Sequence, residues 1–593
     1  MNIYQERTQN LRALMQEHKI DAFIILSADP HLSEYLPDYY KSRVFMSGFK
    51  GSVGTLVFTQ KQAYLWADGR YWLQAEKELV GSGISLQKQD SKNTFLTWLK
   101  ENFDKTQQIG VDFSVLSLEL FKELKKFTTP IHKDLVGLFW KDRPKLPQAQ
   151  IYEHEEKYCS HTRKEKLQLI REQMSKFKAQ NHLISSLDDI AWITNLRGAD
   201  VNFNPVFLSH LLILENEALL FVDKNKLSKE LEKKLEHEGF LVKNYDTLMQ
   251  ELQKLQNTSL LVEPAKMTAL LIQSLDQSVQ IIEAINPSTH LKARKSSKEI
   301  AFIQEAMIED GIALCKFFAW LEEAVAKNEK INELDIDEKI TAFRALSPLY
   351  ISNSFATIAA FNENAALPHY KASKEGFSWL EKDGLLLLDS GAQYKNGTTD
   401  ITRVVPIGKI NKEQIHDYTL VLKANIAMSK TIFPKDIAMP LLDSITRASL
   451  WEEQLDYIHG TGHGVGYFLN VHEGPQVLSY FAPVLEKTKA KEGMITSIEP
   501  GIYKAHKWGI RLENLVAHTQ VENPKNKEFG EFLYFKILTL CPFEPDFIDF
   551  TLLDEKEKTW LNAYHKKVEE KLAPRLQDDK KALEWLKKRT AKI

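Results

Sequence analysis

The sequence predicts a multidomain protein of the α/β and α+β classes, in which two α/β units precede a larger α+β region. Its 593 residues exceed the roughly 100–200 residues of one ordinary domain. Strand-like runs alternate with helical patterns in the first half, as in α/β domains. The second half combines amphipathic helices with strand–turn–strand patterns. We place the three units at residues 1–155, 156–296 and 297–593.

Composition excludes several classes of function. The hydrophobic share of 43% and charged share of 26% are ordinary for a globular protein. A formal net charge of −3 gives no excess of positive charge that would favour binding to nucleic acid or to an anionic membrane. The three cysteines, Cys159, Cys315 and Cys541, are far apart and indicate a reducing compartment without a disulfide framework. The N-terminus is too polar for a signal peptide, and no apolar run approaches the roughly 18 residues of a membrane span. We expect a cytoplasmic protein.

The first unit begins with a helix, because Leu11, Leu14 and Met15 follow the i, i+3, i+4 spacing of an amphipathic face. From Asp21 to about Pro144, the strand-like runs AFIIL, GTLVF and AYLWA alternate with the helical patterns TFLTWLKENF and SLELFKELKKF. This alternation predicts an α/β domain.

The second unit follows a linker, DRPKLPQAQIYEHEEKY, that is rich in proline and charge. An amphipathic helix, KEKLQLIREQMSKF, begins shortly after His161, and strand-like segments such as HLLILENEALLFV follow it. The alternation resembles that of the first unit, without a residue-level repeat. The unit ends near INPSTHLKARKSSKEI, which leads into the helices of the third unit.

Neither N-terminal unit contains a cluster of residues that predicts a catalytic or ligand-binding site. Three closely spaced glycines are interpreted as turn residues rather than a phosphate loop: Gly48, Gly51 and Gly54. Arg70 in DGRY is interpreted as a salt-bridge residue. Asp200 and Asn202 in RGADVNFNP are either structural or directed at an active-site mouth, and the sequence leaves both open.

Two aspartates in the third unit belong to a predicted β-hairpin. Leu385 to Asp389 reads as a buried strand, the turn signal Lys395-Asn396-Gly397 follows, and Thr398 to Val405 is rich in β-branched residues. Alternation along the strands places Asp389 and Asp400 on the same face. A minimal Asn-Gly turn would leave them several residues out of step, so we expect a longer loop or a bulge.

Two glutamates belong to a second predicted hairpin. Glu499 and Glu513 lie symmetrically about His506, so a hairpin that turns there sets them opposite one another. His463 comes from a glycine-rich segment, HGTGHGVGYFLNVHEGP. These glycines argue against the helix of an HExxH zinc protease, and that motif is absent from the sequence.

Together these side chains predict a metal centre. A single Asp or Glu is ordinarily a solvated surface charge, but a carboxylate on an apolar strand is costly unless it is paired or metal-bound. Four carboxylates and one imidazole suit two divalent ions such as Mn²⁺ better than one structural zinc. The predicted metal ligands are Asp389, Asp400, His463, Glu499 and Glu513.

The motifs resemble those of the Xaa-Pro aminopeptidase family (aminopeptidase P) of pita-bread metallopeptidases, in its long, three-domain cytosolic form. The resemblance is carried by LLDSGAQYKNGTTDITR, LDYIHGTGHGVGYFLNVHEGP and GIRLENL. It extends to SGFKGSVGTLVF, ADGRYWLQA and LDDIAWITNLRGADVNFNPVF before them, and to LDEKEKTWLNAYH after them. It implies two creatinase-like N-terminal domains followed by a pita-bread catalytic domain. A local departure is Ile498, where an acidic residue often precedes the family glutamate.

The resemblance also implies roles for individual residues. Asp389 would chelate one Mn²⁺, His463 and Glu499 the other, and Asp400 and Glu513 would bridge them, with a shared water attacking the scissile carbonyl. Glu499 would act as general base. The implied catalytic and substrate-binding residues are His369, His459, His472, Tyr503 and Arg511. The family further implies a homodimer, with Arg70 as a candidate to reach the partner's site.

Three alternatives stay open beside this hypothesis. A prolidase-like dipeptidase shares the metal set and would cut Xaa-Pro dipeptides, but the three-domain length and the sequence of residues 460–475, GTGHGVGYFLNVHEGP, favour aminopeptidase P. A methionine aminopeptidase would not need so large an N-terminal half. A non-enzymatic pita-bread protein that binds peptides should have lost metal ligands, and all five are present.

Overall fold

The computed structural model describes residues 2–593. The chain forms two compact units: Met1–His154 with His161–Thr289, and Glu155–Ser160 with His290–Ile593. Each is described by itself below. The expected division at residues 155 and 296 stays a prediction. Among the described residues, no helix is both long and apolar enough to cross a membrane.

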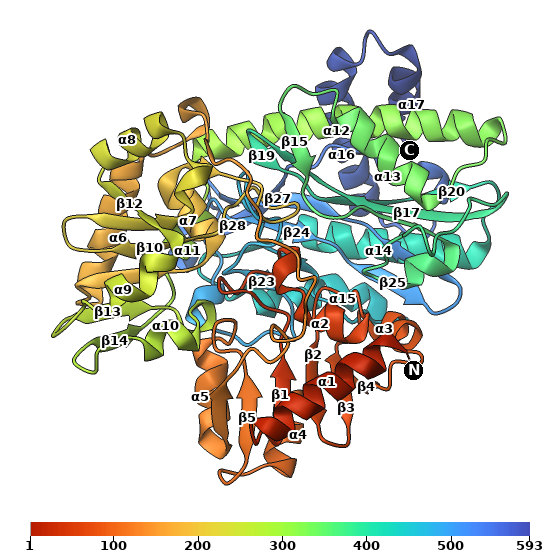
Figure 1. The fold of residues 1–593 in the computed structure, drawn as a ribbon. Helices are drawn as coiled ribbons and strands as arrows, with labels where there is room; N and C mark the ends of the chain where they lie inside the picture. Colours follow the sequence, from red (N-terminus) through yellow and green to blue (C-terminus); the bar gives the residue numbers. More distant parts are fainter. Residues whose placement is uncertain (1) are drawn as a thin grey trace. The chain divides into compact units, whose positions relative to one another are not determined.

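The N-terminal unit contains two six-stranded sheets with the same topology (Figure 1). In the strand orders given next, the second and third of the five neighbouring pairs are antiparallel in both sheets, and the other three pairs are parallel. The first sheet has the order β4 (Ser85–Lys88), β3 (Ala63–Ala67), β2 (Thr55–Thr59), β1 (Ala22–Ile25), β5 (Gln108–Val111), β6 (Thr129–His132). The second has the order β12 (Phe240–Asn244), β11 (Ala218–Val222), β10 (Ser209–Ile213), β8 (Asn181–Ile184), β13 (Ser259–Val262), β14 (Gln280–Glu283). The predicted α/β class is confirmed, and the two domains share an architecture that their residues do not reveal.

Helices around these sheets begin where the sequence supplies capping groups. Asn2 caps the predicted N-terminal helix α1 (Ile3–Glu17), which buries Leu11 and Met15 and half-buries Leu14. Thr162 and Glu165 form a capping box at α6 (Arg163–Lys176). The other helices of eight or more residues in this unit are α4 (Phe95–Asn102), α5 (Leu118–Phe127), α7 (Leu187–Thr194) and α8 (Lys229–His237).

Several predictions for the N-terminal unit are resolved by contacts. Gly48 ends α2 (Ser42–Ser47) in the left-handed region, at φ +73°, as a turn glycine should. Arg70 forms a bidentate ion pair with Asp68, at 2.8 and 2.7 Å. Asp200 is buried against the Lys226 ammonium at 2.8 Å, so it has a structural role, whereas Asn202 is exposed.

The C-terminal unit packs long helices against antiparallel strands. The helices are α12 (Ser297–Ala326), α13 (Glu333–Arg344), α14 (Lys412–Ser429), α15 (Asp443–Trp451), α16 (Glu555–Leu572) and α17 (Lys580–Thr590). The strands of its sheets run β15 (Tyr350–Asn353)-β18 (Ala392–Tyr394)-β19 (Gly397–Thr398); β16 (Ile358–Phe361)-β17 (Gly384–Ser390)-β20 (Ile401–Ile407); and β21 (Ile432–Pro434)-β28 (Phe532–Ile537)-β27 (Asn514–Gln520)-β24 (Ile495–Ile498). One large apolar cluster, with members from Ile303 to Leu586, joins the helices to the β16-β17-β20 sheet and to β24 and β27. The predicted α+β region is confirmed.

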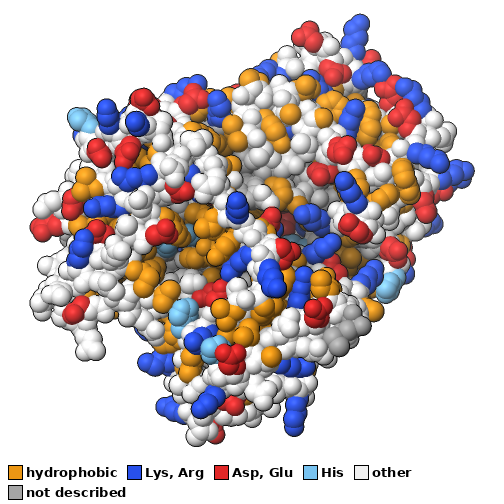
Figure 2. All heavy atoms as spheres, in the orientation of Figure 1, with side chains coloured by type: hydrophobic (Ala, Val, Ile, Leu, Met, Phe, Trp, Pro, Cys, Tyr) orange, Lys and Arg blue, Asp and Glu red, His pale blue; other side chains and the backbone are white. Residues whose placement is uncertain are grey.

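Surface charge is mixed in sign. Figure 2 shows Lys and Arg side chains interspersed with Asp and Glu side chains over the face drawn. This agrees with the small net charge of −3.

Candidate metal centre and active site

The first hairpin places Asp389 and Asp400 as diagonal neighbours. Asp389 at the end of β17 lies opposite Thr402 of β20, and Asp400 lies two residues before Thr402, on the same face. The shared face was predicted. The expected longer loop or bulge was wrong, because Tyr394 pairs with Gly397 and the loop is only Lys395-Asn396. This turn starts one residue earlier than Asn-Gly and keeps one register throughout.

The second hairpin confirms the predicted glutamate pair. Gly501 of β25 (Gly501–Lys504) pairs with Arg511 of β26 (Trp508–Arg511), and Ile498 of β24 pairs with Asn514 of β27. The hairpin turns at His506, at φ +60°. Glu499 and Glu513 therefore lie opposite one another, at the point where the chain leaves one strand pair for the next.

A hydrogen bond between main-chain atoms joins the two hairpins. The Glu513 amide donates to the Thr402 carbonyl at 3.1 Å, and the Thr402 hydroxyl donates to Glu513 Oε2 at 2.8 Å. Ser497 acts similarly, since its hydroxyl donates to Glu499 Oε1 at 3.1 Å and accepts from the His463 amide at 3.0 Å. The sequence interpretation did not name Thr402 or Ser497. Strand alternation could have found both, because each is two residues from a predicted ligand.

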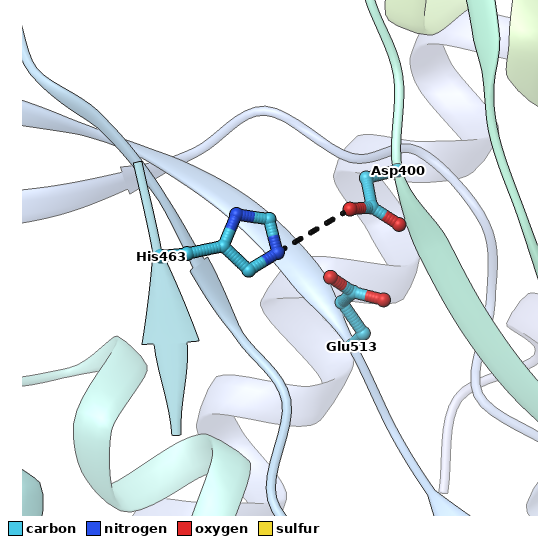
Figure 3. Close-up of side chains that lie close together, drawn as sticks. All are labelled: Asp400, His463 and Glu513. Carbon is cyan, nitrogen blue, oxygen red and sulfur yellow. Dashed lines mark ion pairs between the residues drawn. The ribbon is translucent and has the colours of Figure 1, made fainter. Parts of the chain in front are cut away.

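His463 enters the site from the short strand β22 (Gly462–His463), which pairs with β23 (Val477–Leu478). Its Nδ1 lies 3.0 Å from the Gly464 carbonyl, so Nδ1 carries the proton. Nε2 lies 3.6 Å from Asp400 Oδ2 and 3.4 Å from Glu499 Oε1. Figure 3 shows the ring directed at Asp400 beside Glu513. Potential ligand atoms of Asp400, His463 and Glu513 all lie within 4.8 Å of one another.

Arg511 compensates part of the negative charge. Its guanidinium contacts Asp389 Oδ2 at 2.5 Å and the Tyr503 hydroxyl at 2.8 Å. Tyr503 in turn lies 2.8 Å from His459 Nε2, while His459 Nδ1 lies 2.7 Å from the Gly460 carbonyl. His459 thus holds its proton on Nδ1 and accepts from Tyr503. The structure brings Tyr503, Arg511 and His459 into one hydrogen-bonded chain that ends on Asp389.

The remaining two predicted histidines differ in how closely they are placed. The His472 ring centroid lies 4.4 Å from that of His463. His369 lies on the loop after η6 (Asn362–Ala366), and η6 abuts β26 so closely that a Cβ at Gly509 would overlap the Ala365 carbonyl. That contact anchors the loop beside the second hairpin. The orienting role of His369 stays a prediction.

The charges of the site fit divalent cations. Burial raises the pKa of Glu499 to about 7, with Arg511 opposing the rise and Asp389 adding to it. Burial, then the charges of neighbouring carboxylates, raise the pKa values of Asp400 and Glu513 well above their ordinary range. Asp389 Oδ1 is buried without a hydrogen-bond partner. Bound cations would stabilise these crowded carboxylates and the unsatisfied Asp389 oxygen.

Comparison with known proteins decides the family. Residues 301–520 match the metallopeptidase family M24, residues 7–143 and 142–299 match creatinase/prolidase N-terminal domains, and residues 531–593 match the C-terminal region of peptidase M24. A probable Xaa-Pro aminopeptidase P from Coprinopsis cinerea is 38% identical, over 98% of this chain and 97% of its own. The chain belongs to the Xaa-Pro aminopeptidase P family.

Solved structures agree with this family in fold. The X-prolyl aminopeptidase of Caenorhabditis elegans, described as a cytosolic enzyme with a di-nuclear active site, is 31% identical with a TM-score of 0.94, and each chain is covered completely. The prolidase of Thermococcus sibiricus covers 65% of this chain and 99% of its own, at 22% identity and a TM-score of 0.51, and shows the fold alone. The predicted two creatinase-like domains and pita-bread catalytic domain are confirmed.

Proposed function

We infer that the protein is a metalloexopeptidase that releases the N-terminal residue from peptides with proline in the second position. The observation that carries this inference is a set of four carboxylates and one imidazole, of which Asp389, Asp400 and Glu513 are buried, in a chain that matches aminopeptidase P relatives over 98% of its length. An Arabidopsis relative at 36% identity over 97% of the chain is named aminopeptidase P2.

Two divalent ions, with Mn²⁺ as our candidate, would be held by the five predicted ligands. Asp389 would hold one ion, His463 and Glu499 the other, and Asp400 and Glu513 would contribute to both. When bound, such a pair acidifies a shared water and polarises the scissile carbonyl. The oxygen-rich donor set suits Mn²⁺ better than a thiolate-preferring metal.

The chain's own residues position the substrate and move protons. Glu499, whose Oε1 accepts a hydrogen bond from the Ser497 hydroxyl, is our candidate for the general base that takes the proton of the attacking water. His459 and His472 lie on either side of His463 in sequence, and we assign them contacts with the scissile peptide. Tyr503 and Arg511 would form the wall and rim of the proline subsite. Proline nitrogen has no N–H, so that subsite needs no acceptor there.

Three peptides test this assignment. Purified protein with added Mn²⁺ is incubated with Arg-Pro-Pro, Arg-Ala-Pro and Ala-Pro, and a metal-free sample serves as the control. Metal-dependent release of arginine from Arg-Pro-Pro, with the other two largely intact, is the expected result. Cleavage of Ala-Pro alone would move the assignment to prolidase, and no cleavage despite bound metal would favour a peptide-binding protein.

We further propose that the protein is a homodimer formed through the C-terminal unit. Exposed apolar side chains gather there, with Tyr480 and Phe481 rings 4.0 Å apart and the Trp451 and Tyr480 rings 6.1 Å apart. Phe481 is 57% exposed, and such patches are typical of association sites. Phe481→Glu should shift the molar mass in light scattering from dimer to monomer. Leu346→Glu, at an exposed site on another segment, should not.

A cytoplasmic location is also part of the proposal. All three cysteines are free, as in a reducing compartment, and the Caenorhabditis elegans neighbour is described as cytosolic. Fractionation of cells expressing the chain, with detection by antibody, tests the location.

In the family the first domain can supply a residue to the partner's site, and Arg70 remains our candidate for that role. An unchanged KM in Arg70→Ala would contradict it.

A further inference from the structure

Three buried charges lie together in the C-terminal unit, outside the ligand set. Glu473 Oε1 lies 2.5 Å from the Lys295 ammonium, and Glu473 Oε2 lies 3.6 Å from that of Lys292. All three side chains are 1% exposed. Removing three charges from water is costly unless their geometry is good. Because burying these charges is costly, we looked for a role of the cluster other than stabilising the fold.

Lys295 is held rigidly by the main chain. Its amide donates to the Gly493 carbonyl at 2.8 Å, and the Gly493 amide donates to the carbonyl of His518 in β27 at 3.0 Å. Gly493 has φ +85°, and a Cβ there would overlap the Lys295 carbonyl. The ammonium that holds Glu473 is thus fixed to the same sheet that carries Glu499 and Glu513.

Glu473 reaches the metal centre through one carbonyl. Its amide donates to the Gly464 carbonyl at 2.7 Å, and His463 Nδ1 lies 3.0 Å from that same oxygen. Gly464 has no room for a side chain, because a Cβ there would overlap the Glu473 carbonyl. The position of Glu473 therefore sets the acceptor that orients the His463 ring. His472 directly precedes Glu473 in the chain.

We propose that Glu473, clamped by Lys292 and Lys295, is a positioning residue of the active site. The clamp fixes the segment Val471–Pro475, and through it the Gly464 carbonyl, so that His463 Nε2 and the His472 ring face the metal-binding carboxylates. The proposal rests on the proposed role of His463 as a metal ligand. Groups that orient a ligating histidine typically affect metal affinity by about 10–100-fold.

Glu473→Gln and Lys295→Met test the clamp against a matched control. Lys226→Met breaks the equally buried pair of Lys226 with Asp200, at 2.8 Å in the N-terminal unit. Each purified variant is measured for Mn²⁺ affinity of the metal-free chain by calorimetry, for kcat and KM with Arg-Pro-Pro, and for Tm. We expect all three to lower Tm. Only the two clamp variants should weaken Mn²⁺ binding, by about 10–100-fold. In these two variants, the fold-decrease in kcat should exceed the fold-change in KM.

Unchanged Mn²⁺ affinity and kcat in a folded clamp variant would overturn the proposal and leave the cluster a purely structural one. The same result follows if Lys226→Met shifts both quantities as much. Should Glu473→Gln fail to fold, Lys295→Met decides, because Lys292 still faces Glu473 in it. Failure of the proposed function is distinguishable, since it would appear in the unmodified chain as absent Mn²⁺ binding or absent hydrolysis.

Discussion

In two histidines of the site, the ring is oriented by the carbonyl of the glycine that directly follows it. His459 Nδ1 lies 2.7 Å from the Gly460 carbonyl, and His463 Nδ1 lies 3.0 Å from the Gly464 carbonyl. A carbonyl can only accept, so Nδ1 of each ring carries a proton. The repeated Gly in HGTGHG thus sets a tautomer as well as a turn. His463 Nε2 faces the Asp400 and Glu499 carboxylates, and His459 Nε2 lies 2.8 Å from the Tyr503 hydroxyl.

Glu499→Gln should separate proton transfer from folding. Removing a general base typically lowers kcat by about 10²–10⁴-fold, and the amide keeps the size of the side chain. We expect this loss with metal still bound, measured by single-turnover hydrolysis of Arg-Pro-Pro alongside metal analysis. Glu413→Gln, at an exposed glutamate that contacts Lys504, is the control and should keep full activity. Full activity of Glu499→Gln with two bound ions would remove the base role.

Arg511→Met should lower the free energy of unfolding more in the metal-free chain than in the chain with added Mn²⁺. The substitution removes the only guanidinium contact described for Asp389 and leaves that carboxylate among three others. Breaking a buried ion pair from one side costs about 3–5 kcal/mol. Urea unfolding should show this loss without metal, and added Mn²⁺ should recover part of it by supplying positive charge. An unchanged unfolding midpoint in the metal-free chain would contradict this account of the charges.

The hairpins show how far strand patterns predict a site. Spacing about His506 predicted the Glu499–Glu513 pairing, because a symmetric turn leaves the register no freedom. The Asp389–Asp400 face was also predicted, but the expected longer loop or bulge was wrong, because the loop is the two residues Lys395-Asn396. Turn propensity alone does not distinguish Lys395-Asn396 from Asn396-Gly397, and one residue changes every pairing in a hairpin. Thr402 and Ser497 went unnamed because each acts only through a tertiary contact.

Gly462→Ala should lower kcat/KM, because the added methyl group displaces β22. A Cβ at Gly462 would overlap the Ser497 carbonyl, so the strand that carries His463 must move away from β24. We expect at least a roughly tenfold loss of kcat/KM with a modest fall in Tm, since sub-ångström misplacement of a ligand is costly. Gly376→Ala, where nothing lies within 4 Å of the added Cβ, should behave as the unmodified chain. Equal activity in both variants would refute the close-packing argument.

His518 in β27 should make the fold sensitive to acid. Burial lowers its pKa to about 3, so the native ring stays neutral while the unfolded ring is protonated below its ordinary value of 6.5. Its contribution is fully present above pH 6.5 and is lost as pH falls toward 3. From pH 7 to 5 the linked loss is about 2 kcal/mol. Urea unfolding at both pH values should show a smaller fall in His518→Asn, and an equal fall would contradict the linkage.

The whole chain repeats one architecture before it changes to another. The sequence predicted both N-terminal α/β domains from alternation but showed no repeat between them. The sheets nevertheless share strand order and direction. Topology depends on the pattern of buried residues, which many sequences satisfy. The catalytic half was predicted more fully, because its function fixes residue identities as well as their pattern.

Titration of the metal-free chain with Mn²⁺, while following arginine release from Arg-Pro-Pro, tests the central claim most directly. The proposed set of five ligands for two ions predicts no hydrolysis without metal and activity that saturates at two equivalents per chain. Asp400→Asn, which changes one of the three side chains drawn in Figure 3, should abolish this saturable activity. Hydrolysis by the thoroughly chelated chain, or binding of two ions with no arginine released, would contradict a metal-dependent Xaa-Pro aminopeptidase.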